Sequence, residues 1–291
     1  MAVTDANGRF VQGLSSEDFE IWEGRSRRAV KQFSSARVPT SLGILLDVSG
    51  SMMQGPDARA ADDVRWRDTR RALEALLARL DAADEIMFAV FNDQVAASPW
   101  THERGLILEA FDGLRPSGGT ALLQAITEVA PTFRNAQYQR KVLLLISDGN
   151  DTQMNAAGAL PPPPSVIGDH TAHFGDSQRM QRQAVLGGSR NAVRRSDAVM
   201  YAIGIGTRQG VRVNTNLLDS LTIESGGYTE PLRNPSEIAA AVARICDDLQ
   251  SQYLLTFEPA HADGKYHEFR VRTKDTRVKV RTRAGYVAAS K

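Results

Sequence analysis

The chain has 291 residues, and its 35 basic side chains nearly balance 34 acidic ones, for a formal net charge of +1. This balance argues against a general binder of nucleic acid or anionic membranes, and no apolar run approaches the roughly 20 residues that span a bilayer. Residues 1–5 are mixed and polar, so no secretion signal is predicted within the sequence. The single cysteine, Cys246, excludes an internal disulfide and lies in an apolar helical pattern, which predicts a core thiol.

Residues 1–38 have the pattern of short β-strands separated by turns. An Asn-Gly turn signal occupies positions 7 and 8, and Ser15 with Asp18 predicts a single capped turn. Strands are predicted at 19–23 and 29–33, with a turn at Gly24 between them. These strands are too few to form a stable sheet alone.

From about residue 40 the pattern changes to alternating strands and helices. Short apolar runs predict strands at 42–47, 85–91, 141–147 and 198–205, with a short edge strand in 93–100. Apolar stripes predict helices across 72–80, 122–133 and 238–249, the last beginning with an Asn-Pro-Ser-Glu signal at 234–237. This alternation predicts a doubly wound, Rossmann-like α/β domain with a mainly parallel sheet.

One stretch interrupts this alternation. Residues 152–175 contain four consecutive prolines at 161–164, which cannot propagate a helix or a central strand. An extended surface loop is therefore predicted there, followed by a polar helix at 176–196. His170 and His173 lie near its end without a third ligand, so a transition-metal site is the less favoured interpretation.

After about residue 251 the β pattern returns. Strands are predicted at 253–257, 269–272 and 278–281, with a turn at 261–265. Basic residues alternate with apolar ones through 270–283, which is typical of a solvated strand face, and no aromatic residues between them support nucleic-acid stacking. Our hypothesis is that residues 1–38 and 251–291 pair into one small antiparallel β-sandwich, with the α/β domain of residues 39–250 inserted between them.

Hydroxyl and carboxylate side chains gather in three loops at predicted strand ends or helix starts. The first loop follows strand 42–47, the second precedes the helix at 122–133, and the third follows strand 141–147. Ligands bind outside the carboxyl ends of the strands in open parallel sheets, so these loops are expected to converge. Oxygen donors suit hard divalent cations. Five side chains are candidate ligands: Asp47, Ser49, Ser51, Thr120 and Asp148.

These five residues resemble the metal-ion-dependent adhesion site of von Willebrand factor type A domains in their order, spacing and strand contexts. The resemblance covers roughly residues 40–250. It implies that Ser49, Ser51 and Thr120 coordinate the ion directly, while Asp47 and Asp148 hold it partly through water. It also implies that one coordination position accepts an Asp or Glu carboxylate from a protein partner. Mg²⁺ is the expected ion, with Mn²⁺ and Ca²⁺ as alternatives.

The loops around the five ligands are the expected partner-binding surface. Gly118 and Gly119 allow close backbone approach in the second loop, and Asn150 and Asp151 follow the third strand. The ends of the chain add a second resemblance, to a bacterial, acidobacterial-type subgroup of the same family. It is carried by segments 3–8 and 11–19 and by the Arg-Ala-Gly-Tyr motif at 283–286. Members of this subgroup are usually exported, so the resemblance implies an extracytoplasmic location.

Other interpretations of these loops remain open. Each of the three could be an ordinary turn or a helix cap, because Asp, Ser and Thr are common at such positions. A metal-dependent hydrolase is a further alternative, but no Asp-x-Asp pair, strand-end histidine or Gly-x-Ser-x-Gly elbow supplies a base or nucleophile. A structural scaffold that has lost ligand binding is the third. The sequence therefore favours a non-enzymatic, metal-dependent binding module.

Overall fold

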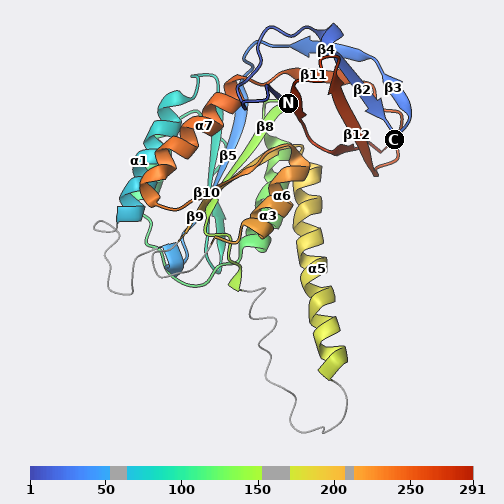
Figure 1. Cartoon of the computed structure of the whole chain (residues 1–291). Helices are drawn as coiled ribbons and strands as arrows, with labels where there is room; N and C mark the ends of the chain where they lie inside the picture. Colours follow the sequence, from blue (N-terminus) through green and yellow to red (C-terminus); the bar gives the residue numbers. More distant parts are fainter. Residues whose placement is uncertain (53–63, 153–170, 207–212, 291) are drawn as a thin grey trace.

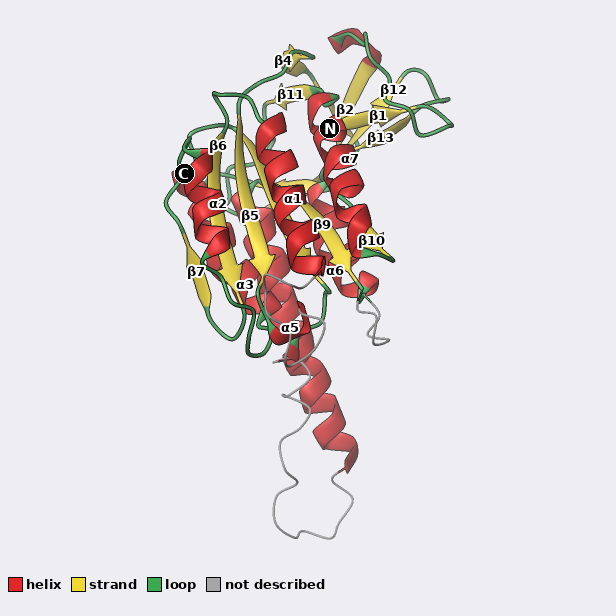
Figure 2. Cartoon of the chain, turned by 90° about the vertical axis from the view of Figure 1, so that its left-hand side faces the viewer, coloured by secondary structure: helices red, strands yellow, loops and turns green. Residues whose placement is uncertain are grey.

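The computed structural model describes residues 1–52, 64–152, 171–206 and 213–290. Its centre is a six-stranded sheet, whose strands are β5 Thr40–Asp47, β6 Glu85–Phe91, β7 Val95–Ala97, β8 Arg140–Ser147, β9 Val199–Ile205 and β10 Thr229–Leu232. Their order is β10-β9-β8-β5-β6-β7, and all are parallel except the edge strand β7 (Figures 1 and 2). The predicted α/β fold class is thereby confirmed.

Helices cover both faces of this sheet because its strands are apolar on both faces. The helices are α1 Val64–Arg79, α2 Arg104–Asp112, α3 Leu122–Val129, α5 Thr171–Ser196, α6 Thr215–Thr222 and α7 Ile238–Gln250. Alternate residues of β5 show how the faces divide. Ile44 and Leu46 pack into the core cluster that contains α1, α2 and α7, whereas Leu45 packs into the cluster that contains α3, α5 and α6.

Short 3₁₀ turns complete the described helical elements. They are η1 Ser16–Asp18, η2 Gly50–Met52, η3 Ala130–Asn135, η4 Ile223–Ser225 and η5 Pro235–Glu237. The first is the predicted capped turn, in which the Ser15 N–H donates to the Asp18 carboxylate at 2.7 Å. Among the described helices, none combines the length and apolarity needed to cross a membrane.

The two ends of the chain form one antiparallel assembly, which we call the terminal β-unit. Its strands are β1 Ala2–Thr4, β2 Phe19–Glu23, β3 Ser26–Arg28, β4 Val30–Ser34, β11 Leu254–Phe257, β12 Tyr266–Thr273, β13 Lys279–Arg281 and β14 Gly285–Val287. Strand β1 pairs with β13, β4 with β11, and β2 with β12, so each of these pairs joins the two ends of the chain. The terminal segments therefore pair with each other, as the sequence predicts (Figure 1).

The structure corrects the sequence prediction at helix boundaries. The helix predicted at 122–133 is α-helical only over α3 Leu122–Val129 and continues as the 3₁₀ turn η3, which has Pro131 near its start. Helix α5 begins at Thr171, so residues 171–175 are helical rather than part of an extended loop. No proline occurs between Pro164 and the start of α5, so no proline prevents a helix from beginning at Thr171. Residues 153–170 of the predicted loop, including His170, lie outside the described residues. Helices α2 and α6 and strands β1, β3, β10 and β14 have no individual counterpart among the sequence predictions.

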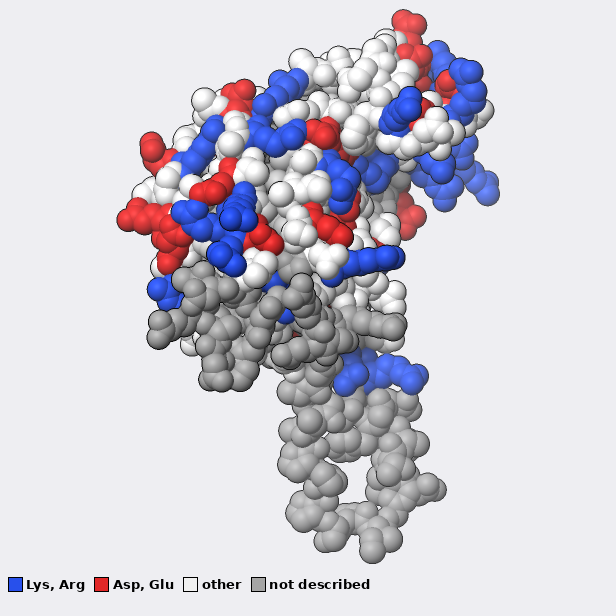
Figure 3. Space-filling view, turned by 60° about the vertical axis from the view of Figure 1, so that its left-hand side comes forward, with Lys and Arg blue, Asp and Glu red and all other residues white. Residues whose placement is uncertain are grey.

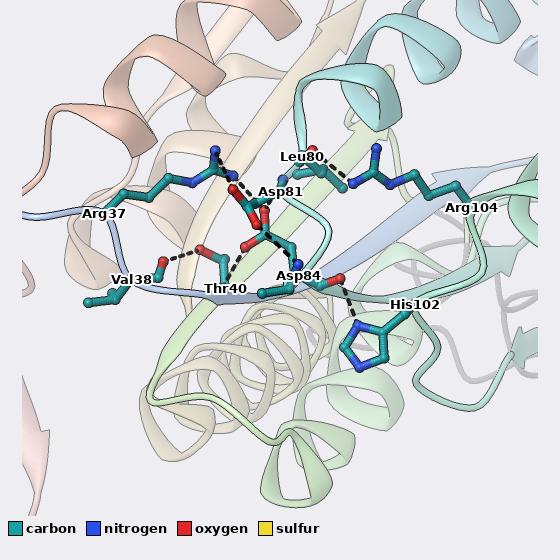
Figure 4. A network of polar contacts seen from close by, with 9 residues as sticks. Arg37, Val38, Thr40, Leu80, Asp81, Asp84, His102 and Arg104 are labelled. Atoms are coloured by element: carbon teal, nitrogen blue, oxygen red, sulfur yellow. Dashed lines mark hydrogen bonds and ion pairs between the residues drawn. The ribbon is translucent and has the colours of Figure 1, made fainter.

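A buried network fixes the chain where it enters the sheet. Arg37 donates to Asp84 at 2.6 Å, and the N–H groups of Thr40 and Asp81 donate to the same carboxylate, each at 2.8 Å (Figure 4). His102 Nδ1 lies 3.1 Å from the Asp84 carbonyl oxygen. The network joins the start of β5 to the turn before β6, at the edge of the sheet where the parallel strands begin.

Candidate metal centre

Three loops meet at the opposite edge of the sheet, where the parallel strands end. We call residues 47–52, 116–121 and 147–152 the site loops. Strands β5 and β8 are parallel neighbours, with Leu46 opposite Ile146, so the first and third loops leave the sheet side by side. The second loop enters α3. The expected convergence of the three loops is therefore present in the fold.

The first site loop is folded around a buried carboxylate. Asp47 is the last residue of β5 and is fully buried. Its Oδ1 accepts the Ser49 N–H at 2.9 Å, and its Oδ2 accepts the Ser147 hydroxyl at 2.6 Å. The hydroxyl oxygens of Ser49 and Ser51 are 3.1 Å apart. These contacts bring one carboxylate and two hydroxyls into a short turn.

The second site loop is tied to the first through its backbone. The Gly50 N–H donates to the Gly118 carbonyl at 3.1 Å, and the Ser117 N–H donates to the Val48 carbonyl at 2.8 Å. Gly118 has a φ of +78°, which favours glycine. A Cβ on Gly119 would lie 2.4 Å from a carboxylate oxygen of Asp93, so any larger residue there would have to displace that side chain.

The third site loop is linked to Thr120. The Thr120 N–H donates to the Thr152 hydroxyl at 2.7 Å, and the Thr152 N–H donates to the Thr120 carbonyl at 2.9 Å. Asp148 is fully buried, and its Oδ1 accepts the Asn150 N–H at 2.8 Å. Within the described residues, Asp148 Oδ2 is buried and has no hydrogen-bond partner.

Burial dominates the electrostatics of the site. It raises the pKa of Asp47 to about 7, and the nearby Asp148 charge adds to that rise, while hydrogen bonds from Ser147 and Ser49 oppose it. Among the residues that the structure describes, no Lys or Arg forms an ion pair with Asp47 or Asp148. Arg65 reaches the first loop, but it donates to the Ser51 carbonyl, at 3.0 Å. Two buried acids therefore lie together without a basic partner in the part of the chain that the structure describes.

The donor set fits a hard divalent cation. Carboxylate and hydroxyl oxygens are the ligands that Mg²⁺ and Ca²⁺ prefer. An ion there would satisfy the unpartnered Asp148 oxygen and offset the cost of burying both acids. All five predicted ligand residues lie on the three connected loops. Four of them are buried, and Ser51 is exposed.

Several residues that support these loops are not recognisable in the sequence. Ser147 looks like an ordinary last strand residue, yet it donates to Asp47. Asp93 receives the Gly119 N–H at 2.7 Å from a loop distant in sequence. Asp151, expected on the partner-binding surface, is buried and accepts the Leu123 N–H at the start of α3, at 2.9 Å. Its position indicates a framework role.

Comparison with solved structures places the fold among known domains. A von Willebrand factor type A protein from Catenulispora acidiphila is 16% identical, with a TM-score of 0.53, and the match covers 80% of this chain and 49% of that chain. The von Willebrand factor domain of the type V pili tip protein Mfa5 from Porphyromonas gingivalis is 14% identical, with a TM-score of 0.53, over 73% of this chain and 95% of that one. At these identities the likeness concerns the fold alone.

Comparison of sequences gives a more local result. No curated protein matches the chain significantly. A family model does match, and the matched segment runs from β5 to the third site loop and contains all five candidate ligands. Residues 42–150 match the von Willebrand factor type A domain.

Proposed function

We propose that the α/β domain is a non-enzymatic, metal-dependent protein-binding module. One divalent cation, Mg²⁺ in the first instance, is held by the three site loops and captures an Asp or Glu side chain of a partner. The observation that carries this proposal is the pair of buried carboxylates without a basic partner among the described residues. The ligands are Asp47, Ser49, Ser51, Thr120 and Asp148.

The residues divide into two roles under this proposal. The hydroxyls of Ser49, Ser51 and Thr120 bind the ion directly, and the carboxylates of Asp47 and Asp148 hold it partly through water. Because the direct protein ligands are neutral, the ion keeps a strong attraction for an incoming carboxylate. Exposed backbone around Gly118 and the half-buried Asn150 would contact the rest of the partner.

The absence of catalytic groups in the site loops supports binding rather than catalysis. The sequence of these loops contains no histidine, cysteine or lysine, so a general base other than the carboxylates is not supplied there. The fold is shared with a domain of a pilus tip protein, which supports an adhesive role and an extracytoplasmic location for this chain. Acidic and basic side chains are interspersed over the side of the α/β domain shown in Figure 3, so that side carries no single-sign patch of the kind that binds nucleic acid.

Metal binding is tested by thermal unfolding of the full chain with chelator or with millimolar Mg²⁺, Mn²⁺ or Ca²⁺. An ion at about 100 times its dissociation constant should stabilise the fold by about 2.7 kcal/mol. Ser51→Ala and Asp148→Asn should reduce this gain, while Asp275→Ala, at a half-buried position between β12 and β13, should keep it. An unchanged melting temperature with every ion would contradict the proposal.

Partner capture is tested with a displayed library of neutral peptides that each carry one Asp or Glu. Peptides selected in Mg²⁺ should lose at least about tenfold in affinity when their Asp or Glu is changed to Asn or Gln. The unchanged peptides should lose affinity by a similar factor when a chelator removes the metal. Ser51→Ala should bind them more weakly than Asp275→Ala. Selected peptides that bind equally well in chelator would show that the metal does not mediate capture.

A further inference from the structure

A second cluster of metal-binding side chains lies in the terminal β-unit, away from the site loops. Glu23 ends β2, His261 precedes β12, and His267 lies on β12. One donor atom from each of the three lies within 4.8 Å of the others. The cluster thus combines a carboxylate from the N-terminal part of the chain with two imidazoles from the C-terminal part.

The carboxylate of this cluster is buried and held in place. Glu23 Oε2 accepts the Arg28 Nε–H at 2.8 Å and the Ala260 N–H at 3.1 Å. Its Oε1 accepts the Tyr286 hydroxyl at 2.5 Å, which occupies one of the two lone pairs of that oxygen. Carboxylates that bind metals are commonly fixed by hydrogen bonds of this kind.

Of the two imidazoles, His267 is oriented for binding and His261 has to move. Their rings stack with centroids 4.4 Å apart and planes inclined by 14°, and because a metal lies in the plane of each ring that binds it, His261 must leave this stack for both rings to bind one ion. His267 Nε2 lies 2.8 Å from Asp263 Oδ1, so donation of that N–H leaves Nδ1 with a lone pair for a metal. A histidine whose second nitrogen contacts a carboxylate is the usual arrangement at zinc sites.

We propose that Glu23, His261 and His267 bind a transition metal of the Zn²⁺ class, with Asp263 orienting His267. Two nitrogen ligands and one carboxylate are a known zinc set that leaves one position for water. The nitrogen donors also separate this site from the oxygen-only site loops, which suit harder ions. Because its ligands come from both ends of the chain, the metal crosslinks the β2–β12 pair.

Tetrahedral zinc with bonds of about 2.0–2.1 Å brings its ligand atoms to roughly 3.3 Å from one another. His261 is exposed, so its side chain can move toward Glu23 and His267 without disturbing the core. The site closes by rotation of this side chain. Its loss should leave the fold intact, which makes His261 the most informative position to change.

The experiment is a titration of tag-free, chelator-treated full chain with Zn²⁺ alone, followed by calorimetry and thermal unfolding. One zinc should bind per chain and raise the melting temperature. His261→Ala and His267→Ala should each weaken binding at least about tenfold, whereas His102→Ala should not. Co²⁺ in place of zinc should give the visible absorption of a tetrahedral site.

The same Zn²⁺ titration of Ser51→Ala distinguishes zinc binding at the histidine cluster from zinc binding at the site loops. Zinc binding that is unchanged in Ser51→Ala but lost in His261→Ala supports the proposal. Absence of zinc binding, or binding unaffected by both histidine variants, would overturn it and leave Glu23 as the buried partner of Arg28 and Tyr286. Neither result depends on Mg²⁺ binding at the site loops.

Discussion

The two edges of the central sheet both contain buried aspartates, but among the described residues only one edge supplies basic partners for them. Where the parallel strands begin, Asp84 is paired with Arg37 and Asp248 is paired with Arg281, at 2.6 and 2.5 Å. Both carboxylates are almost completely buried. At this edge, arginines of the chain neutralise the buried acids, and these ion pairs connect neighbouring segments of the fold.

Where the parallel strands end, Asp47 and Asp148 are equally buried and form no ion pair with the described residues. Removing charges from water is costly unless they are compensated. One edge therefore compensates the charge of its buried acids from within the chain, although Asp248 Oδ1 there has no hydrogen-bond partner among the described residues, while the other edge has capacity for a cation from solution. The lack of a compensating positive charge, rather than burial or residue type, therefore distinguishes the candidate binding site from the edge where the strands begin.

The largest effect is expected from Arg281→Met, which breaks the compensated edge. It leaves Asp248 buried with Tyr201 as its remaining partner at 2.6 Å, and should lower the free energy of unfolding by about 3–5 kcal/mol. Urea unfolding measures this loss, which should be the same with and without Mg²⁺. The matched double variant Arg281→Met with Asp248→Asn should recover part of it; no recovery would show that lost packing, not charge, is responsible.

A substitution at the other edge should have the opposite sign. Asp47→Asn removes an uncompensated charge while keeping an oxygen for the Ser49 N–H, so the metal-free protein should become more stable at pH 8, by about 1–3 kcal/mol. The same variant should lose its stabilisation by Mg²⁺. Destabilisation of the metal-free protein by this change would contradict the comparison between the two edges.

The pH dependence of this difference follows from the raised pKa of Asp47, about 7 against an ordinary value of 3.8. The folded state keeps its proton to higher pH than the unfolded chain, so the ionised carboxyl destabilises the fold increasingly from about pH 4 and fully above about pH 7. The stability gap between Asp47→Asn and the parent should therefore be small at pH 4 and largest at pH 8. Urea unfolding in chelator at several pH values measures it, and a gap that does not change with pH would contradict the raised pKa.

Much of the fold and of the candidate site could be predicted from local patterns. The strand-end position of Asp47 and the loop positions of Thr120 and Asp148 are local features. The parallel pairing of β5 with β8 brings the loops of Asp47 and Asp148 side by side, and backbone hydrogen bonds join the loop of Thr120 to both. Ser147 and Asp93 could not be recognised, because their roles depend on side-chain contacts between loops. The ion pair between Asp248 on α7 and Arg281 on β13 could not be recognised either, because it also depends on a contact between distant segments.

In the terminal β-unit, even less of the side-chain arrangement could be predicted from local sequence patterns. The pairing of the two ends follows from their having too few strands separately, but the register does not. Only the observed register, with Glu23 opposite Phe269, brings the end of β2 beside His267. A strand's partner is set by long-range packing, so a cluster drawn from both ends of the chain has no local signature.

The smallest effect is expected from Arg37→Ala, at the compensated edge. Arg37 is partly exposed, and Asp84 keeps two backbone N–H donors, from Thr40 and Asp81, after its removal (Figure 4). The free energy of unfolding, measured in urea, should fall by only about 1 kcal/mol, because the remaining hydrogen bonds still satisfy the buried carboxylate. His102→Ala is the matched control in the same network.

A loss with Arg37→Ala as large as that with Arg281→Met would have a wider consequence. It would show that backbone donors cannot compensate a buried aspartate once its arginine is gone. Asp47 and Asp148 also accept backbone N–H groups, from Ser49 and Asn150. If such donors count for little, both edges depend on a cation, and the edges differ only in whether that cation is an arginine of the chain or an ion from solution.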